Sequence, residues 1–144
     1  MQADSAIYPQ LTKLKQNFND DAIRVAWRTK QVIDFSFMFM YSKNISEYYI
    51  QIEDDVRTAT NYFTGIKNYI DRFKTENPPW AALQFSKLGF IGKLFRSSDL
   101  EILSKYLLLF QSEQPVDWLF RYFSMSKSQS KELIRYPGLF QHMG

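Results

Sequence analysis

The amino-acid sequence predicts an α/β layered domain, and three observations lead to this prediction. Segments with helical character alternate with short segments rich in aromatic and β-branched residues, which is typical of domains in which helices cover a sheet. Hydrophobic residues make up 45% of the chain and aromatic residues 17%, a composition typical of a globular protein. The chain has 144 residues, which is long enough for a single domain with a buried core.

The first regular element expected is a helix over about residues 20–41. Asp20 or Asp21 can cap it, because a carboxylate at that position accepts a hydrogen bond from a free backbone amide. One side of this helix is expected to be apolar, formed by Ala26, Ile33, Phe37 and Met40. Residues 35–41 are apolar nearly all round, so this end should be buried, and a strand is the competing interpretation.

Strands and helices then alternate toward the middle of the chain. Residues 48–52 are aromatic and β-branched and predict a mostly buried strand. A second helix is expected over residues 61–74 and a second strand over residues 80–85. Residues 88–92 contain two glycines and are expected to form an ordered turn, in which both glycines suit unusual backbone angles.

The last part of the chain is expected to be mainly helical. Ser98 and Glu101 form a capping box, with Ser98 as the cap. The helix face that follows is expected to contain Leu100, Leu103, Leu107 and Phe110. Pro115 suits the first turn of a further helix. Residues 124–131 predict a solvated loop, and residues 133–136 a short strand.

Composition excludes several classes of function. The 18 basic and 15 acidic residues are mixed along the chain and form no basic block, so no nucleic-acid partner is expected. The absence of cysteine excludes disulfides and thiolate metal sites. We find no run of 18 apolar residues and no signal peptide in residues 1–144, so we expect membrane attachment only through an anchor that is absent here.

The acidic triplet Glu53-Asp54-Asp55 is the strongest candidate for chemistry. It follows a predicted buried strand, and ligands in open α/β sheets bind beyond the carboxyl ends of strands. Adjacent carboxylates repel one another unless a cation or hydrogen-bond donors compensate them, and such oxygen ligands suit Mg²⁺ or Mn²⁺. The alternative is a solvated acidic turn, and the residues alone leave both interpretations open.

Two further side chains are candidates for the same cleft. Asp117 lies in the first turn of a predicted helix, where a carboxylate is usually a cap or a partner of the helix dipole, and it could instead be a general base. His142 is the only histidine of the chain. It can complete a metal site or donate a hydrogen bond to a phosphate. The alternative is a packed or exposed histidine near the end of the sequence without a functional role.

Basic residues on the first helix and one sequon complete the candidates. Arg24, Arg28 and Lys30 form a basic face whose ordinary interpretation is a solvated helix surface. Asn44-Ile45-Ser46 is an N-glycosylation sequon, which matters only if the chain is lumenal.

Five segments, in order, carry a family resemblance: Tyr8-Pro9-x-Leu11, Arg28-Thr29-Lys30-Gln31, Tyr48-Tyr49-Ile50-Gln51-Ile52-Glu53-Asp54-Asp55, Phe85-Ser86-Lys87-Leu88-Gly89-Phe90-Ile91-Gly92-Lys93 and Leu139-Phe140-Gln141-His142-Met143-Gly144. With them and Pro115-Val116-Asp117-Trp118-Leu119, the chain resembles the N-acetylglucosaminyltransferase IV family over almost its whole length. Each segment alone is weak, and the ordered set is highly specific.

The resemblance implies a nucleotide-sugar glycosyltransferase domain of the GT-A-like α/β type, incomplete at its N-terminal side. Such enzymes move N-acetylglucosamine from UDP-N-acetylglucosamine to a mannose of an N-glycan and form a β1,4 branch. The implied mechanism is one inverting displacement that depends on Mn²⁺ or another divalent cation. The implied location is the Golgi lumen or membrane.

The resemblance also assigns roles to individual residues. Asp55 would be a metal ligand, with Glu53 and Asp54 on the side of the donor nucleotide. Arg28 and Lys30 would also lie on the nucleotide side, and His142 near the diphosphate. Asp117 would be the base that activates the acceptor hydroxyl, by analogy with an Asp-Trp helix start in related inverting transferases.

The chain departs from the family pattern at two positions. Gln84 stands where the family usually has Glu, and Arg121 follows the Asp-Trp motif where relatives often carry an acid. These departures support an alternative function: a catalytically inactive, transferase-like protein that regulates another Golgi N-acetylglucosaminyltransferase as its partner.

Overall fold

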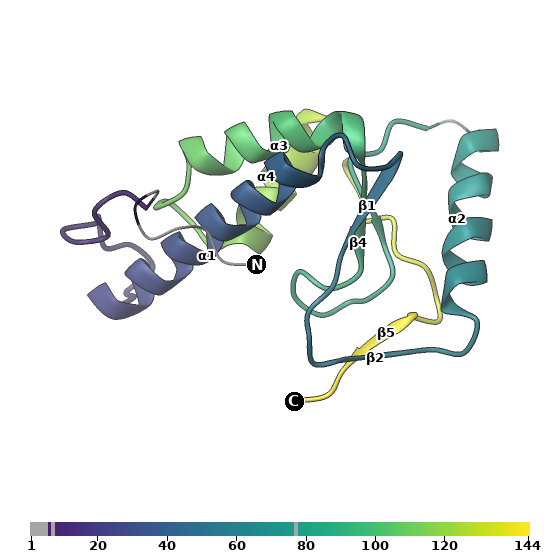
Figure 1. Ribbon diagram of the computed structural model, residues 1–144, viewed down its shortest axis with the longest axis horizontal. Helices are drawn as coiled ribbons and strands as arrows, with labels where there is room; N and C mark the ends of the chain where they lie inside the picture. Colours follow the sequence, from purple (N-terminus) through teal and green to yellow (C-terminus); the bar gives the residue numbers. More distant parts are fainter. Residues whose placement is uncertain (1–5, 7, 77) are drawn as a thin grey trace. The chain divides into compact units, whose positions relative to one another are not determined.

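A computed structural model describes residue 6, residues 8–76 and residues 78–144 (Figure 1). The chain divides into two compact units: unit 1 contains Met1–Glu47 and Ser97–Phe123, and unit 2 contains Tyr48–Arg96 and Ser124–Gly144. The described residues form four helices and five short strands, which confirms the predicted mixture of helix and sheet.

Unit 1 is helical. Helix α1 spans Ala22–Ser42, close to the predicted bounds, and the carboxylate of Asp21 caps it by accepting a hydrogen bond from the Arg24 amide at 2.7 Å. Helix α3 spans Ser97–Leu109. Helix α4 spans Val116–Ser126, and its last residues belong to unit 2.

Helices α1 and α3 lie side by side (Figure 1). The hydroxyl of Ser36 donates to the carbonyl of Ser104 at 2.8 Å, and the Ser104 hydroxyl donates to the carbonyl of Ser36 at 2.9 Å. This reciprocal pair satisfies buried polar atoms and lets the two backbones approach closely. The predicted apolar face of α3 is confirmed for Leu100, Leu103 and Leu107, which are fully buried, whereas Phe110 is partly exposed.

The predicted apolar face of α1 is wrong. Of the four predicted residues only Ile33 is buried. The buried residues of α1 are Val25, Arg28, Thr29, Val32, Ile33, Phe35, Ser36 and Phe39. Three of these are polar or charged, so hydrophobicity along the helix does not mark the buried side.

The predicted start of α3 is also displaced. The helix begins at Ser97, directly after strand β4, so Ser98 lies in its first turn and is not the cap. The Ser97 amide donates to the carbonyl of Glu47 at 2.9 Å. A partner from outside the helix therefore satisfies one of the free amides of the first turn.

Unit 2 contains a three-stranded antiparallel sheet in the order β1-β4-β3. Strand β1 spans Tyr48–Gln51, β4 spans Lys93–Arg96 and β3 spans Leu83–Gln84. Strand β1 confirms the predicted strand, although most of its residues are only half-buried. Strand β4 was not predicted from the sequence. The predicted strand over 80–85 is reduced to two residues, because the Gln129 side chain accepts the two amides that precede β3.

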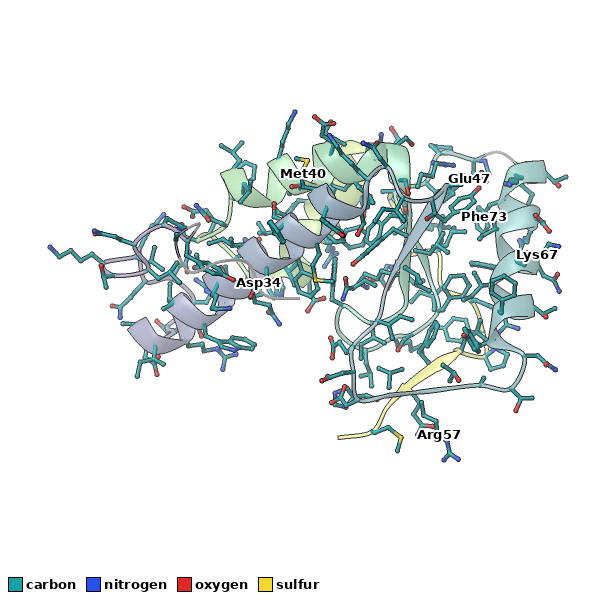
Figure 2. All side chains as sticks on the ribbon, viewed as in Figure 1. Asp34, Met40, Glu47, Arg57, Lys67 and Phe73 are labelled. Carbon is teal, nitrogen blue, oxygen red and sulfur yellow. The ribbon has the colours of Figure 1, made fainter. Side chains whose placement is uncertain are left out.

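Helix α2, Tyr62–Glu76, covers one face of this sheet and confirms the second predicted helix. The core between them consists of Ile66, Phe73, Trp80, Leu83, Phe85, Ile91, Leu94, Leu139 and Phe140. Figure 2 shows Phe73 on the side of α2 that faces the strands and Lys67 on the outer side. This alternation of buried and exposed positions is typical of a helix that packs one face on a sheet.

The glycine turn before β4 has the predicted backbone. Gly89 has φ +48° and Gly92 has φ +63°, values that residues with a Cβ rarely adopt. A Cβ on Gly92 would lie 2.7 Å from Cδ2 of Phe140. The Gly92 amide donates to the carbonyl of Gln51 at 2.8 Å, and its carbonyl accepts from the Phe85 amide at 2.9 Å. The turn thus ties β1 to the end of β3.

A second sheet of two antiparallel strands brings the C-terminal segment to the acidic triplet. Strand β2 spans Val56–Thr58 and β5 spans Phe140–His142. Val56 pairs with His142 and Thr58 with Phe140. Neither strand was predicted from the sequence, because three-residue strands leave almost no periodic pattern.

The predictions for residues 124–136 are partly wrong. Helix α4 extends to Ser126, and Ser124 and Gln129 are buried, so residues 124–131 are not a solvated loop. The predicted strand over 133–136 is an isolated parallel bridge between Ile134 and Gln84. The Arg135 amide donates to the carbonyl of Gln84 at 2.9 Å and completes this single rung.

The fold is a mixed α/β arrangement with small antiparallel sheets. The acidic triplet follows a strand, as predicted, and it lies in the turn between β1 and β2; the sheet that contains β1 is antiparallel. Among the helices of the described residues, none is both long enough and apolar enough to cross a membrane.

Candidate functional site

Three side chains of unit 2 converge on one point: Glu53, Asp55 and His142. One ligand atom from each lies within 4.8 Å of the others. Nε2 of His142 lies 3.1 Å from Oδ2 of Asp55 and 4.0 Å from Oε2 of Glu53. All three side chains are partly exposed, so a ligand can reach them from solvent.

The pairing of β2 with β5 creates this convergence. Glu53 and Asp55 lie in the turn that leads into β2, and His142 is the last residue of β5. The Met143 amide donates to the backbone carbonyl of Asp55 at 2.9 Å, so the ladder continues past the strand ends. The same ladder fixes the acidic turn and the histidine relative to each other.

The backbone of Gly144 holds the imidazole in place. Nδ1 of His142 lies 2.9 Å from the Gly144 carbonyl oxygen and 3.1 Å from its amide nitrogen. With Nδ1 occupied, Nε2 is the nitrogen that faces the two carboxylates. A Cβ on Gly144 would lie 3.1 Å from Cε1 of His142 and 3.7 Å from Oδ2 of Asp55, so glycine leaves room for the site.

The donor set of this cluster fits a divalent cation. Two carboxylates and one imidazole supply oxygen and nitrogen ligands of the kind that bind first-row divalent metals, and carboxylates suit Mn²⁺ and Mg²⁺. A hydrogen bond to the second nitrogen of a ligating histidine is the usual way in which proteins orient that ring. A cation here would retain open positions for a ligand, because the three side chains remain partly exposed.

A buried polar row lies across the sheet next to the acidic turn. Gln51, Lys93 and Gln84 pair across β1, β4 and β3, so their side chains lie on one face. All three are buried. Nζ of Lys93 donates to Oε1 of Gln84 at 2.9 Å. A glutamine at 84 therefore gives the buried ammonium a neutral acceptor.

The row is connected to the acidic turn through Gln51. The Tyr49 hydroxyl donates to Oε1 of Gln51 at 2.5 Å, and Nε2 of Gln51 donates to the carbonyl of Ile52 at 3.1 Å. Burial raises the pKa of Tyr49 to about 12. The hydroxyl therefore stays protonated and keeps its role as a donor to Gln51. Sequence reasoning missed this support because β4 was not predicted.

The other predicted site residues do not belong to the group formed by Glu53, Asp55 and His142. Asp54 lies in the same turn, is exposed, and is not part of the convergent group. Asp117 lies in the first turn of α4, in unit 1, and is exposed as well. The predicted roles of Asp54 at the nucleotide and of Asp117 as a base stay predictions.

The predicted basic face of α1 is solvated only in part: Arg24 is exposed and Lys30 is half-buried, whereas Arg28 is not at the surface. Arg28 is buried, its Nη1 lies 3.2 Å from Asp20, and it donates to the Asn17 side chain. Lys30 pairs with Asp34 at 2.8 Å, and this hydrogen bond raises the pKa of Lys30. Both cations thus have acidic partners in unit 1, and their assignment to a donor nucleotide stays a prediction.

Comparison with known proteins gives the family of this chain. Residues 1–144, the whole chain, match the MGAT4 conserved region. The chain belongs to the MGAT4 family. The family resemblance noted from the ordered segments of the sequence is thereby confirmed.

Several curated relatives of the MGAT4 family are similar over nearly the whole chain. An alpha-1,6-mannosyl-glycoprotein 4-beta-N-acetylglucosaminyltransferase of Gallus gallus is 50% identical over 138 residues, which are 95% of this chain and 29% of the relative. An alpha-1,3-mannosyl-glycoprotein 4-beta-N-acetylglucosaminyltransferase C of Sus scrofa is 46% identical over 143 residues, 99% of this chain and 29% of the relative. An alpha-1,3-mannosyl-glycoprotein 4-beta-N-acetylglucosaminyltransferase A of Gallus gallus is 41% identical over an alignment of 151 positions, gaps included, which covers 95% of this chain and 28% of the relative.

This MGAT4 chain thus spans less than a third of the length of these relatives. No solved structure matches it. The assignment to the MGAT4 family therefore rests on sequence similarity. The fold of the chain is the arrangement of helices and small antiparallel sheets described above.

Proposed function

We propose that the protein containing this chain transfers N-acetylglucosamine from UDP-N-acetylglucosamine to a mannose of an N-glycan, in β1,4 linkage. The observation that carries the proposal is the convergence of Glu53, Asp55 and His142 within 4.8 Å. The names of the relatives support the reaction, since all describe 4-beta-N-acetylglucosaminyl transfer to a mannosyl glycoprotein. They differ in the mannose arm, α1,3 or α1,6.

Glu53, Asp55 and His142 would hold a divalent cation, Mn²⁺ by family resemblance. When bound, the cation supplies positive charge that neutralises the departing diphosphate. The three side chains would hold the cation, and Gly144 and the β2–β5 ladder fix the imidazole and the acidic turn. By resemblance, Glu53 and Asp54 also line the nucleotide side, with Arg28 and Lys30 as further candidates there.

The chemical step needs a base for the acceptor. In an inverting displacement the acceptor oxygen bonds to C1 of the sugar while the bond from C1 to the phosphate oxygen breaks, and UDP leaves with the electron pair. The proton of the acceptor hydroxyl goes to the base, for which Asp117 is the candidate. An exposed carboxylate in a first helical turn is accessible to such a hydroxyl.

A transfer assay tests this function. The full-length protein that contains these residues would be incubated with UDP-N-acetylglucosamine, Mn²⁺ and a biantennary N-glycan, and a relative of known activity would be the positive control. Asp117→Asn should lower kcat by about 10²-fold or more while donor binding is unchanged. Asp55→Asn should weaken donor binding as well. No transfer by a folded protein would exclude the proposal.

A second candidate function is regulation of another Golgi transferase without catalysis. Gln84 favours it, because the family usually has Glu at this position and Gln84 contacts the buried Lys93. Gln84→Glu separates the two functions. In an active enzyme the change should have little effect, whereas an inactive protein that gains transfer activity would identify Gln84 as the cause of its inactivity. Capture of a Golgi transferase by the unmodified protein would support regulation.

A further inference from the structure

Two aromatic rings of unit 1 lie together at the surface and have no role in the site described above. Phe18 and Trp118 are 51% and 54% exposed, and their ring centroids are 5.8 Å apart at 56°. Trp118 lies in the first turn of α4. Large rings half open to solvent are typical of binding surfaces, because aromatic side chains normally bury most of their area.

The backbone that presents Phe18 is strained. Phe18 has φ +60° and Asn19 has φ +56°, and two consecutive non-glycine residues in this region are rare. Strain of this kind is concentrated at functional sites, where the surroundings hold it. Here the strained segment carries an exposed ring, so its conformation is not needed to bury that ring.

The surroundings hold this segment from two sides. The Asn17 side chain donates to the carbonyl of Glu113 at 2.6 Å, which ties the segment to the loop before α4. On the other side Arg28 of α1 donates to Asn17 and pairs with Asp20 at 3.2 Å. The segment is thus anchored on both flanks of Phe18.

A buried cation, Arg28, contacts one of the two rings. It is only 2% exposed, and its guanidinium carbon lies 5.4 Å from the centroid of Phe18. The buried Arg28 therefore supports the Phe18 ring from the inner side through a cation–π contact and leaves the outer side of the ring open.

This combination matches a pyranose sugar. A hexose ring has one face of C–H groups, which stack on aromatic faces, and a rim of hydroxyls, which need hydrogen-bond partners. Trp118 directly follows Asp117, the candidate base for the acceptor hydroxyl. We propose that Phe18 and Trp118 form an acceptor platform on which a hexopyranose of the N-glycan stacks beside Asp117. This rests on the proposed function.

Steady-state kinetics of the full-length protein test the platform. Trp118→Ala should raise the KM for the biantennary acceptor about five- to tenfold, and Trp118→Phe should retain most of the affinity, because it keeps an aromatic face. The KM for UDP-N-acetylglucosamine should not change in either variant. Trp27→Ala is the matched control, since Trp27 is 61% exposed on α1 in the same unit.

The outcomes separate this inference from the proposed function. An acceptor KM for Trp118→Ala equal to that of Trp27→Ala would overturn the platform and leave the transferase intact. If the unmodified protein transfers nothing, saturation-transfer NMR with the same glycan decides. Binding that is lost in Trp118→Ala and kept in Trp118→Phe and Trp27→Ala supports the platform. No glycan binding by the folded, unmodified protein overturns it.

Discussion

Nε2 of His142 lies 3.1 Å from Oδ2 of Asp55, which joins the last strand of the chain to the acidic turn. This contact exists because Val56 and His142 are paired across β2 and β5. It converts an exposed acidic turn into a three-sided site of two carboxylates and one imidazole. The site can therefore be tested from either of its two segments.

The first prediction concerns Mn²⁺ affinity, measured by the loss of the free Mn²⁺ electron paramagnetic resonance signal. Asp55→Asn and His142→Ala should each weaken Mn²⁺ binding about tenfold or more, because each removes one ligand. Asp71→Asn is the control, since Asp71 is an exposed aspartate on α2 outside the convergent group. Equal Mn²⁺ affinity in all three variants would exclude this site.

The second prediction concerns the two glycines of the turn before β4. Gly92→Ala should lower the free energy of unfolding by about 2–4 kcal/mol, because it adds a clash with Phe140 to the strain of φ +63°. Gly89→Ala should cost only about 1 kcal/mol, because no atom lies within 4 Å of the added Cβ. Urea unfolding measures both, and an equal loss in the two variants would show that the contact with Phe140 contributes nothing.

The third prediction concerns the buried row. Gln84→Leu should destabilise the protein by about 1–3 kcal/mol, because Lys93 loses a buried hydrogen-bond acceptor. Gln84→Glu should be at least as stable as the parent at neutral pH, because a charged acceptor strengthens the bond to an ammonium. Thermal unfolding of both variants measures this. A Gln84→Leu variant as stable as the parent would contradict the role given to the row.

The fourth prediction concerns alkaline pH. Burial raises the pKa of Tyr49 from 10.0 to about 12 in the folded protein. The unfolded chain loses this proton first, so the stability from a neutral, buried Tyr49 is complete below pH 10 and is lost as pH rises from 10 to about 12. Urea midpoints between pH 9 and 11.5 should fall less steeply for Tyr49→Phe. Parallel curves for parent and variant would contradict this assignment.

The sequence was sufficient for the approximate bounds of the long helices. Asp21 caps α1 as expected, and the predicted bounds of the second helix, residues 61–74, are close to those of α2. The face of α1 could not be predicted, because the buried Arg28 pairs with Asp20 and Asn17, which come from outside the helix. From the sequence alone, a buried arginine with such partners cannot be distinguished from an arginine at the surface.

The geometry of the site depends on the pairing of two strands that lie far apart in the sequence, and no local sequence pattern predicts this pairing. Strands β2 and β5 have three residues each, too few for an alternating pattern. His142 and the acidic triplet were both candidates, but only the pairing of these strands shows that His142 meets Glu53 and Asp55 and not Asp54. The polar row required β4, a four-residue strand with a buried lysine, which is not the apolar pattern typical of a sheet core.

A calorimetric titration of the donor tests whether Glu53, Asp55 and His142 form a metal-dependent site. UDP-N-acetylglucosamine would be titrated into the full-length protein with and without Mn²⁺, and again into the Asp55→Asn and Asp71→Asn variants. Binding should require Mn²⁺, be lost in Asp55→Asn and be kept in Asp71→Asn. Binding of equal strength without Mn²⁺, or in Asp55→Asn, would contradict the claim that Glu53, Asp55 and His142 form a metal-dependent donor site.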